Sequence, residues 1–236
     1  MKFMMMLLAA LLIPATAKAA DKPLSEQLDK YKKAFTEKAD PATIKAYEAG
    51  VLEIAQSGVL QKAKNVGDTA PGFTLPDATG KDVSLAALLQ KGPVVLIWYR
   101  GEWCPYCNLQ LHDIQKHLKD FKAENAEVVA ISPEKPDNGW RLQDRENIEF
   151  HVLSDLNSKT AEAYGVVYTL PPDVAERIQQ KFDIHERNAD NSNRLPLAAT
   201  YVIGQDGIIT YAYLDSDYRK RAETTDILTH LKSLQK

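Results

Sequence analysis

The most constraining feature of the sequence is the segment 93–99, Pro-Val-Val-Leu-Ile-Trp-Tyr, which is continuously apolar and rich in β-branched residues. Such a run is typical of a strand buried on both faces, because a strand with one wet face alternates apolar and polar residues. A second run of this kind occupies 127–131. Strands buried on both faces need helices on both sides of their sheet, so the two runs predict an α/β fold.

The segments around these two runs complete the predicted architecture. Their hydrophobic periodicity predicts further strands and helices. The additional strands are expected at 73–75, 150–153, 200–203 and 208–214, and the helices at 84–89, 109–121, 158–164, 171–182 and 227–234. Gln205-Asp-Gly207 between two strands indicates a β-hairpin, which makes the central sheet mixed. The polar segment 186–195 is predicted to be a loop.

Residues 20–66 precede this alternation and predict a helical extension. Apolar residues recur there at helical spacing on either side of Asp40-Pro41, beginning with Leu24, Leu28, Tyr31 and Phe35. The segment contains no Cys, no His and no glycine-rich loop, so we interpret it as structural. The domain organisation predicted is therefore an extension at 20–66 and a main domain at 67–236.

The first 19 residues are typical of a signal peptide. Lys2 precedes an apolar run at 3–13, which is too short to cross a bilayer of about 30 Å as a helix. Small residues follow, and Ala17 and Ala19 fit a cleavage site, which we place after Ala19. The alternative is a membrane anchor or a buried helix. Cleavage predicts a periplasmic or secreted protein without stable membrane association.

Charge and composition exclude several classes of function. Lys and Arg number 29 against 32 Asp and Glu, so no basic excess favours nucleic-acid binding. No glycine-rich phosphate loop is present, so we expect no nucleotide or flavin cofactor. The five histidines are scattered, and we expect no metal.

The two cysteines carry the chemistry. Cys104-Pro-Tyr-Cys107 follows the buried strand and is expected to open a helix. The N–H groups at a helix start favour a thiolate, so we expect Cys104 to be the more acidic and more exposed thiol. Cys107, one turn later, is close enough to attack an oxidised Cys104.

Three other interpretations of the pair compete with redox chemistry. A structural disulfide here would close only a four-residue loop and join no remote segments. A zinc site would need two more ligands, and the chain has no other Cys. The thiols could also be inert core residues. The strand–turn–helix context favours redox chemistry.

The longer string Tyr99-Arg-Gly-Glu-Trp-Cys-Pro-Tyr-Cys107 resembles the YRGxWCPYC signature of the peroxiredoxin-like branch of the thioredoxin superfamily. The segments 67–75, 92–96 and 195–203 resemble its opening strand, first core strand and hairpin entry, so the resemblance covers about residues 50–236. It implies a thioredoxin-like fold and a thiol peroxidase. Cys104 would reduce hydrogen peroxide or an organic hydroperoxide, Cys107 would resolve the oxidised form, and a thioredoxin-like dithiol would recycle it.

The sequence departs from this family at three positions. Typical members place Pro and Thr seven and three residues before the reactive Cys, where this chain has Ile97 and Gly101. They also carry an Arg before the hairpin strand, where this chain has Leu-Ala-Ala at 197–199. Arg100 is the candidate to supply the missing cation at the catalytic site, and Arg221 is a second. Either could instead be a solvated surface charge.

Two alternative functions remain open. One is a thiol–disulfide oxidoreductase of the periplasm, whose relatives carry a cis-Pro where this chain has Ala199. A non-Pro cis bond costs about 3 kcal/mol, so the bond before Ala199 should be trans, which favours the peroxidase. The other, minor alternative is a metal-binding thioredoxin-like carrier.

Overall fold

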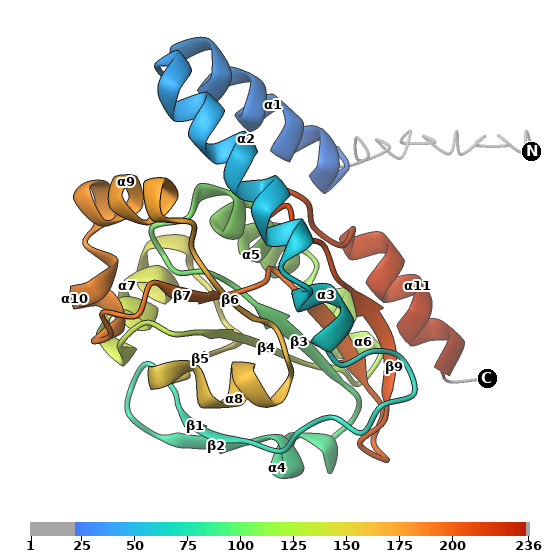
Figure 1. The fold of residues 1–236 in the computed structure, drawn as a ribbon. Coiled ribbons are helices and arrows are strands. Elements are labelled where there is room, and N and C mark those ends of the chain that lie inside the picture. Colours follow the sequence, from blue (N-terminus) through green and yellow to red (C-terminus); the bar gives the residue numbers. More distant parts are fainter. Residues whose placement is uncertain (1–21, 235–236) are drawn as a thin grey trace, which may run out of the picture.

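The computed structural model describes residues 22–234 and shows one α/β unit with a helical hairpin at its N-terminal end (Figure 1). The predicted signal peptide at 1–19 lies outside the described residues. Within the described part of the chain, no helix is both long enough and apolar enough to cross a membrane.

A five-stranded sheet forms the centre of the molecule, in the strand order β5-β4-β3-β8-β9. Its strands are β3 (Val94–Trp98), β4 (Glu127–Ser132), β5 (His151–Ser154), β8 (Thr200–Ile203) and β9 (Ile209–Tyr213). β3, β4 and β5 run parallel, whereas β8 is antiparallel to both β3 and β9. The sheet is therefore mixed, as predicted. Every residue of β3 is fully buried, which explains the continuous apolar run.

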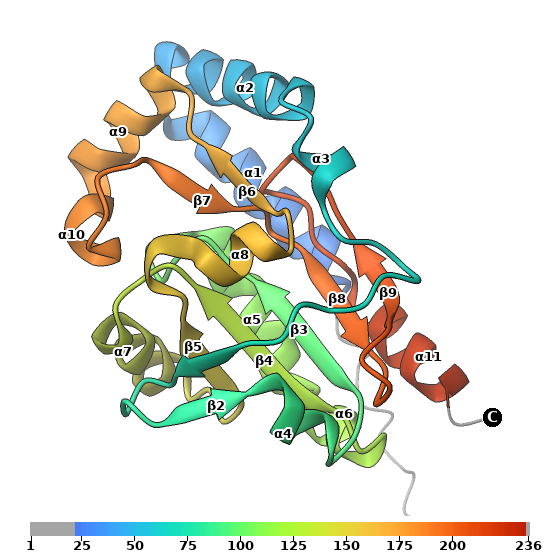
Figure 2. The same cartoon turned by 60° about the horizontal axis from the view of Figure 1, so that its bottom comes forward.

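Helices cover both faces of this sheet, as the buried strands require. β3 is joined to β4 by α5 (Pro105–Lys116) and α6 (Leu118–Ala123), and α11 (Thr224–Leu234) follows β9. Figure 2 shows α5 and α11 on one side of the sheet, and α8 (Lys159–Ala163), which follows a short 3₁₀ turn at Leu156–Ser158, on the other. The structure also contains a helix that we did not predict, α7 (Pro136–Glu146). Its sequence has too few apolar residues to show the helical periodicity on which the predictions rest.

A small antiparallel ribbon precedes the central sheet. It consists of β1 (Thr74–Pro76) and β2 (Asp82–Ser84), and a bridge from Asp77 to Leu153 attaches it to the edge at β5. The Ser84 hydroxyl accepts a hydrogen bond of 3.2 Å from the Ala87 N–H and so caps α4 (Leu85–Leu89), as the sequence predicts.

The segment 166–198 contains more regular structure than the helix at 171–182 that the sequence predicts for it. It contains β6 (Val167–Thr169), α9 (Pro172–Phe182), α10 (Ile184–Asn188) and β7 (Arg194–Pro196). The prediction of a loop at 186–195 is wrong at both ends, because α10 extends into its start and β7 begins before its end. β7 forms because it pairs with β6, so its order depends on a contact distant in sequence.

The N-terminal hairpin consists of α1 (Leu24–Lys38) and α2 (Pro41–Gln56), followed by the single turn α3 (Val59–Lys62). It breaks at Asp40, as predicted, where the carboxylate caps α2 by accepting the Thr43 N–H at 2.9 Å. α1 packs on α5, and α2 packs on α9. The Glu223 carboxylate accepts the N–H groups that open α1, at 2.9 and 2.8 Å. The extension is thereby fastened to the end of the molecule that carries the cysteines.

Candidate active site

The Cys104-Pro-Tyr-Cys107 segment follows the loop after β3 and forms the first turn of α5. Cys104 is the N-cap residue of α5, and Pro105 occupies its first position, where the missing N–H has no helical partner to lose. The Cys107 N–H donates to the Cys104 carbonyl at 3.0 Å, which closes the first turn. The expectation that the pair opens a helix directly after the buried strand is confirmed.

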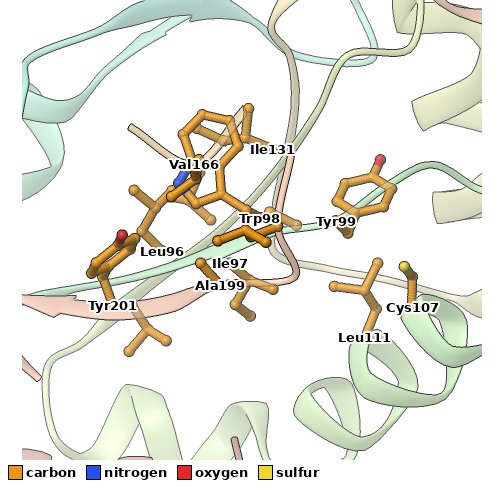
Figure 3. Close-up of a cluster of buried hydrophobic side chains, with 14 of the residues drawn as sticks. Leu96, Ile97, Trp98, Tyr99, Cys107, Leu111, Ile131, Val166, Ala199 and Tyr201 are labelled. Carbon is orange, nitrogen blue, oxygen red and sulfur yellow. The ribbon is translucent and has the colours of Figure 1, made fainter. Parts of the chain in front are cut away.

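Both thiols are free and buried, with exposed fractions of 1% for Cys104 and 0% for Cys107. Cys107 and Leu111 project from α5 toward the end of β3, near Tyr99 (Figure 3). The expectation of an exposed Cys104 is wrong, because the side chain is buried. The Cys104 side chain accepts no capping hydrogen bond from the helix start. Burial and the neighbouring Cys107 instead raise the pKa of Cys104 well above its ordinary value.

A buried guanidinium lies against the Cys107 sulfur. Arg221 donates from Nη2 to the Cys107 sulfur at 3.2 Å. Burial alone would raise the pKa of Cys107, but three contacts outweigh it. These are the hydrogen bond from Cys104, the charge of Arg221 and the backbone N–H of Arg100, and together they lower the pKa of Cys107 to about 5.

Both candidate arginines are at this site, and neither is a solvated surface charge. Arg100 is 2% exposed, and its guanidinium carbon lies 4.1 Å from the ring centre of Tyr218 and 4.9 Å from that of Trp103. Burial alone would lower the pKa of Arg100, but Tyr168 and the thiols hold it above its ordinary value. The structure therefore places two permanent positive charges around the thiol pair.

Cys104 forms part of the wall of a small cavity of about 70 Å³. Most of the wall is aromatic, and Arg100 is its buried cation. The lining residues are Tyr31, Phe35, Tyr47, Arg100, Trp103, Cys104, Pro105, Tyr106, Ile178, Lys181, Phe182 and Tyr218. Cys107 is not among them. A small molecule in this cavity would meet Cys104 and not Cys107.

The N-terminal hairpin supplies part of this wall, although we interpreted residues 20–66 as structural. Tyr31 of α1 meets the Tyr106 ring edge-on, with 5.0 Å between ring centres, and Phe35 stacks on Tyr47. A wider groove of about 710 Å³ runs outward from these rings between the hairpin and α9. Sequence reasoning missed these residues because aromatic side chains at helical spacing are equally typical of core packing.

A buried carboxylate supports the loop that leads to Cys104. Glu134 is fully buried, accepts the Glu102 N–H at 2.6 Å and lies 3.3 Å from a guanidinium nitrogen of Arg187. Burial raises the pKa of Glu134 to about 7. Within residues 22–234, no group of three or more His, Cys, Asp and Glu side chains is arranged to hold a metal ion.

Comparison with known proteins decides the family. A sequence profile described as the AhpC/TSA family matches residues 66–212. The chain belongs to the AhpC/TSA family. It is 38% identical over 99 residues to two Mycobacterium tuberculosis proteins named as peroxiredoxins, covering 42% of this chain and 62% of each relative. It is 28% identical over 170 residues to chloroplastic peroxiredoxin Q of Populus jackii, covering 72% and 69% of the two chains.

The fold is shared with solved structures of the same kind. The crystal structure of peroxidoxin BcpB from Mycobacterium tuberculosis superposes with a TM-score of 0.58 at 23% identity, covering 73% of this chain and 99% of that one. The thioredoxin-like architecture predicted from the sequence is thus confirmed. The match to the family begins after α1 and α2, so the hairpin that covers Cys104 lies outside it.

One departure from the AhpC/TSA pattern has a structural reason. Gly101, which stands where typical members have Thr, adopts a φ of +148°, a region that favours glycine. A Cβ at this position would lie 2.3 Å from Trp103 Nε1 and 2.9 Å from the Glu134 carboxyl carbon. The Trp103 side chain therefore occupies the space that a threonine would need.

Proposed function

We propose that this protein is a thiol peroxidase that reduces hydrogen peroxide or an organic hydroperoxide through Cys104. The observation that carries the proposal is the position of Cys104 in the wall of a small, largely aromatic cavity, with Cys107 directly behind it. Membership of the AhpC/TSA family supports it, as do the peroxiredoxin names of the relatives.

The arrangement suits a two-step thiol reaction. The Cys104 sulfur attacks the terminal peroxide oxygen, which forms a sulfenic acid and releases water or an alcohol. Cys107, one helical turn away, then displaces hydroxide from the sulfenic acid and forms a disulfide. Arg100 lies at the cavity, where its charge stabilises the negative charge that develops on the leaving oxygen.

We further propose that an external dithiol, such as a thioredoxin-like protein, reduces the disulfide by exchange. Both sulfurs are buried in the reduced form, so a protein partner requires movement of the covering helix α1. The sequence of residues 1–19 supports export to the periplasm or the cell exterior, which is also a proposal.

The alternative function is that of a thiol–disulfide oxidoreductase acting on other proteins. The burial of Cys104 beneath the α1–α2 hairpin weighs against it, because a protein disulfide is far larger than the 70 Å³ cavity. The peptide bond before Ala199 is trans, since the described residues contain no cis peptide. That outcome agrees with the expectation from sequence.

The test compares the two substrates directly. The reduced protein is mixed with hydrogen peroxide or cumene hydroperoxide in a stopped-flow instrument, and loss of thiol is followed at fixed pH. In parallel, the same protein is assayed for reduction of insulin disulfides. We expect oxidation by peroxide to be much faster than that of a free thiol, and to be abolished by Cys104→Ser. If the protein reacted slowly with both peroxides but reduced insulin rapidly, the peroxidase proposal would be wrong and the thiol–disulfide oxidoreductase would take its place.

A further inference from the structure

A groove of about 710 Å³ lies between the N-terminal hairpin and α9, next to the small cavity that has Cys104 in its wall. Figures 1 and 2 both show α9 beside α2. The groove and the cavity share four lining side chains, which are Tyr31, Phe35, Tyr47 and Lys181. The two spaces therefore meet at these side chains.

The two spaces differ in what they can hold. The cavity at Cys104 measures about 70 Å³, whereas an apolar cavity that accepts benzene measures about 150 Å³. The cavity has room for a hydroperoxyl group but not for an aromatic or branched body attached to it. An organic hydroperoxide that presents its O–O group to Cys104 would therefore extend its body past the shared side chains and into the groove.

The two sides of the groove differ in chemistry. All the apolar side chains that line it come from the hairpin, and they are Tyr31, Ala34, Phe35, Ala39 and Tyr47. The rings of Phe35 and Tyr47 are stacked, with 5.9 Å between their centres. α9 contributes polar side chains that share one face of the helix, namely Arg177, Gln180 and Lys181. A ligand that is apolar along one side and charged at one end would match both sides.

The charge of the groove is positive. Lys38, Arg177 and Lys181 supply three cations, and among the described residues that line the groove Asp40 is the only carboxylate. The Asp40 carboxylate is already engaged in capping α2, because it accepts the N–H of Thr43 at 2.9 Å and its hydroxyl at 2.6 Å. Arg177 spends one of its five N–H donors on the same hydroxyl, at 2.7 Å. The remaining donors suit an anionic ligand.

We propose that this groove binds the organic part of a hydroperoxide that carries both an apolar body and a carboxylate. The body packs on the aromatic side chains of the hairpin, and the carboxylate pairs with Arg177 and Lys181. The substrate class rests on the proposed peroxidase function, whereas the binding of an apolar carboxylate does not. The reaction itself is unchanged: the Cys104 thiol and ROOH give a Cys104 sulfenic acid and ROH, and the carboxylate of R takes no part.

A matched pair of substrates tests the role of charge. Cumene hydroperoxide and its 4-carboxy derivative have the same reacting group and the same ring, and they differ in charge. In stopped-flow oxidation of the reduced protein, we expect the carboxylate to react about fivefold faster at low ionic strength, the size of effect typical of a partly exposed ion pair. Added salt should reduce this advantage, since neither Arg177 nor Lys181 is buried. The chain has a net charge of −3, so a general electrostatic effect would slow the anion.

Charge reversal in the groove locates the effect. Lys181→Glu should abolish or invert the preference for the 4-carboxy derivative, and Arg177→Gln should reduce it. The readout is the ratio of the two rate constants, in which a change in the reactivity of Cys104 itself cancels. The matched control is Lys33→Glu, because Lys33 is an exposed lysine of α1 that does not line the groove and gives the same change in net charge. It should keep the wild-type ratio.

The aromatic side of the groove has its own test. Phe35→Ala should slow the reaction with both cumyl compounds relative to the reaction with hydrogen peroxide, which has no body to place in the groove. An equal effect on all three substrates would mean that Phe35 supports the cavity at Cys104 and does not bind the organic part.

A ligand without an O–O group tests the site independently of the reaction. 4-Isopropylbenzoate is titrated into the reduced protein and its binding is followed by ligand-observed NMR. Its dissociation constant should rise about threefold or more in Lys181→Glu, as expected for the loss of a partly exposed ion pair, and should not change in Lys33→Glu.

The outcomes separate this inference from the proposed function. If cumene hydroperoxide oxidised the protein but the 4-carboxy derivative had no advantage, and Lys181→Glu left the ratio unchanged, the inference would be overturned and the peroxidase would stand. If no hydroperoxide reacted, the substrate class would fall together with the proposed function. Binding of 4-isopropylbenzoate that depends on Lys181 would then still support the carboxylate site, and binding that does not would refute it.

Discussion

Replacing Gly101 by alanine should destabilise the protein far more than the addition of a single methyl group suggests. The new Cβ would lie 2.3 Å from Trp103 Nε1 and 2.7 Å from Trp103 Cδ1, so the indole must move by about 1 Å or more to restore ordinary contact. Holding a non-glycine residue at a φ of +148° costs about 1–3 kcal/mol.

Displacement of the Trp103 indole has its own cost. Overpacking typically costs about 1–3 kcal/mol, and the indole would also lose its contact with the buried Arg100 guanidinium, worth about 0.5–2 kcal/mol. We therefore expect Gly101→Ala to lower the free energy of unfolding by about 3–5 kcal/mol. Gly101→Thr, which restores the residue typical of the family, should be worse rather than better.

The assay is urea unfolding followed by circular dichroism, with the reduced protein at fixed pH. The control is Gly80→Ala, since Gly80 has a φ of +85° but no atom within 4 Å of the added Cβ. It isolates the backbone cost, which should be about 1–2 kcal/mol. If Gly101→Ala were no more destabilising than Gly80→Ala, the argument from the Trp103 contact would be refuted.

Three further predictions concern charged groups near the site. Arg100→Ala should shift the first titration of the reduced thiol pair to higher pH and Arg100→Lys should shift it less, as measured by absorbance near 240 nm; an unchanged titration would remove Arg100 from the site's electrostatics. The raised pKa of Glu134, about 7 against an ordinary 4.5, means that the folded state binds a proton that the unfolded state has lost, so wild-type stability should fall by about 3 kcal/mol as pH rises from 4.5 to 7. Most of that slope should be lost from urea unfolding of Glu134→Gln, and a slope equal to that of wild type would contradict the assignment. Glu223→Ala leaves two N–H groups at the start of α1 without their acceptor and should cost about 1–2 kcal/mol, with faster amide hydrogen exchange in α1 and faster alkylation of Cys104; Glu223→Gln, which keeps an acceptor, should cost less.

The centre of the sheet could be predicted from sequence because β3 and β4 are buried on both faces and are therefore continuously apolar, and the hairpin could be predicted from its turn residues. The apolar runs at 93–99 and 127–131 became β3 and β4, and the hairpin at 200–214 became β8 and β9. The segment 166–198 could not be predicted in the same way. β6 and β7 are each three residues long and form only because they pair with one another.

The candidate site was predictable in its position but not in its electrostatics. The spacing and context of Cys104 and Cys107 place them at the start of a helix, and the structure agrees. The expectation of an exposed Cys104 failed because it left out the N-terminal hairpin, whose Tyr31, Phe35 and Tyr47 share the cavity wall with Cys104. Arg221, which donates to the Cys107 sulfur, lies 114 residues beyond it in the chain, and no local pattern reports such a contact.

Access to Cys104 is governed by a part of the chain that the family match does not include. Residues 66–212 supply the two cysteines, Arg100 and Trp103, whereas Tyr31, Phe35 and Tyr47 come from the hairpin before them. α1 is held on α5 by its buried Leu24 and Leu28 and by the ring contact of Tyr31 with Tyr106, and the Glu223 carboxylate caps its first turn. A relative with only the matched region would lack that side of the cavity wall. Under the proposed function, we therefore expect the position of α1 to set the selectivity of Cys104 for small oxidants over bulky partners, and we expect α1 to move before a protein reductant reaches the disulfide.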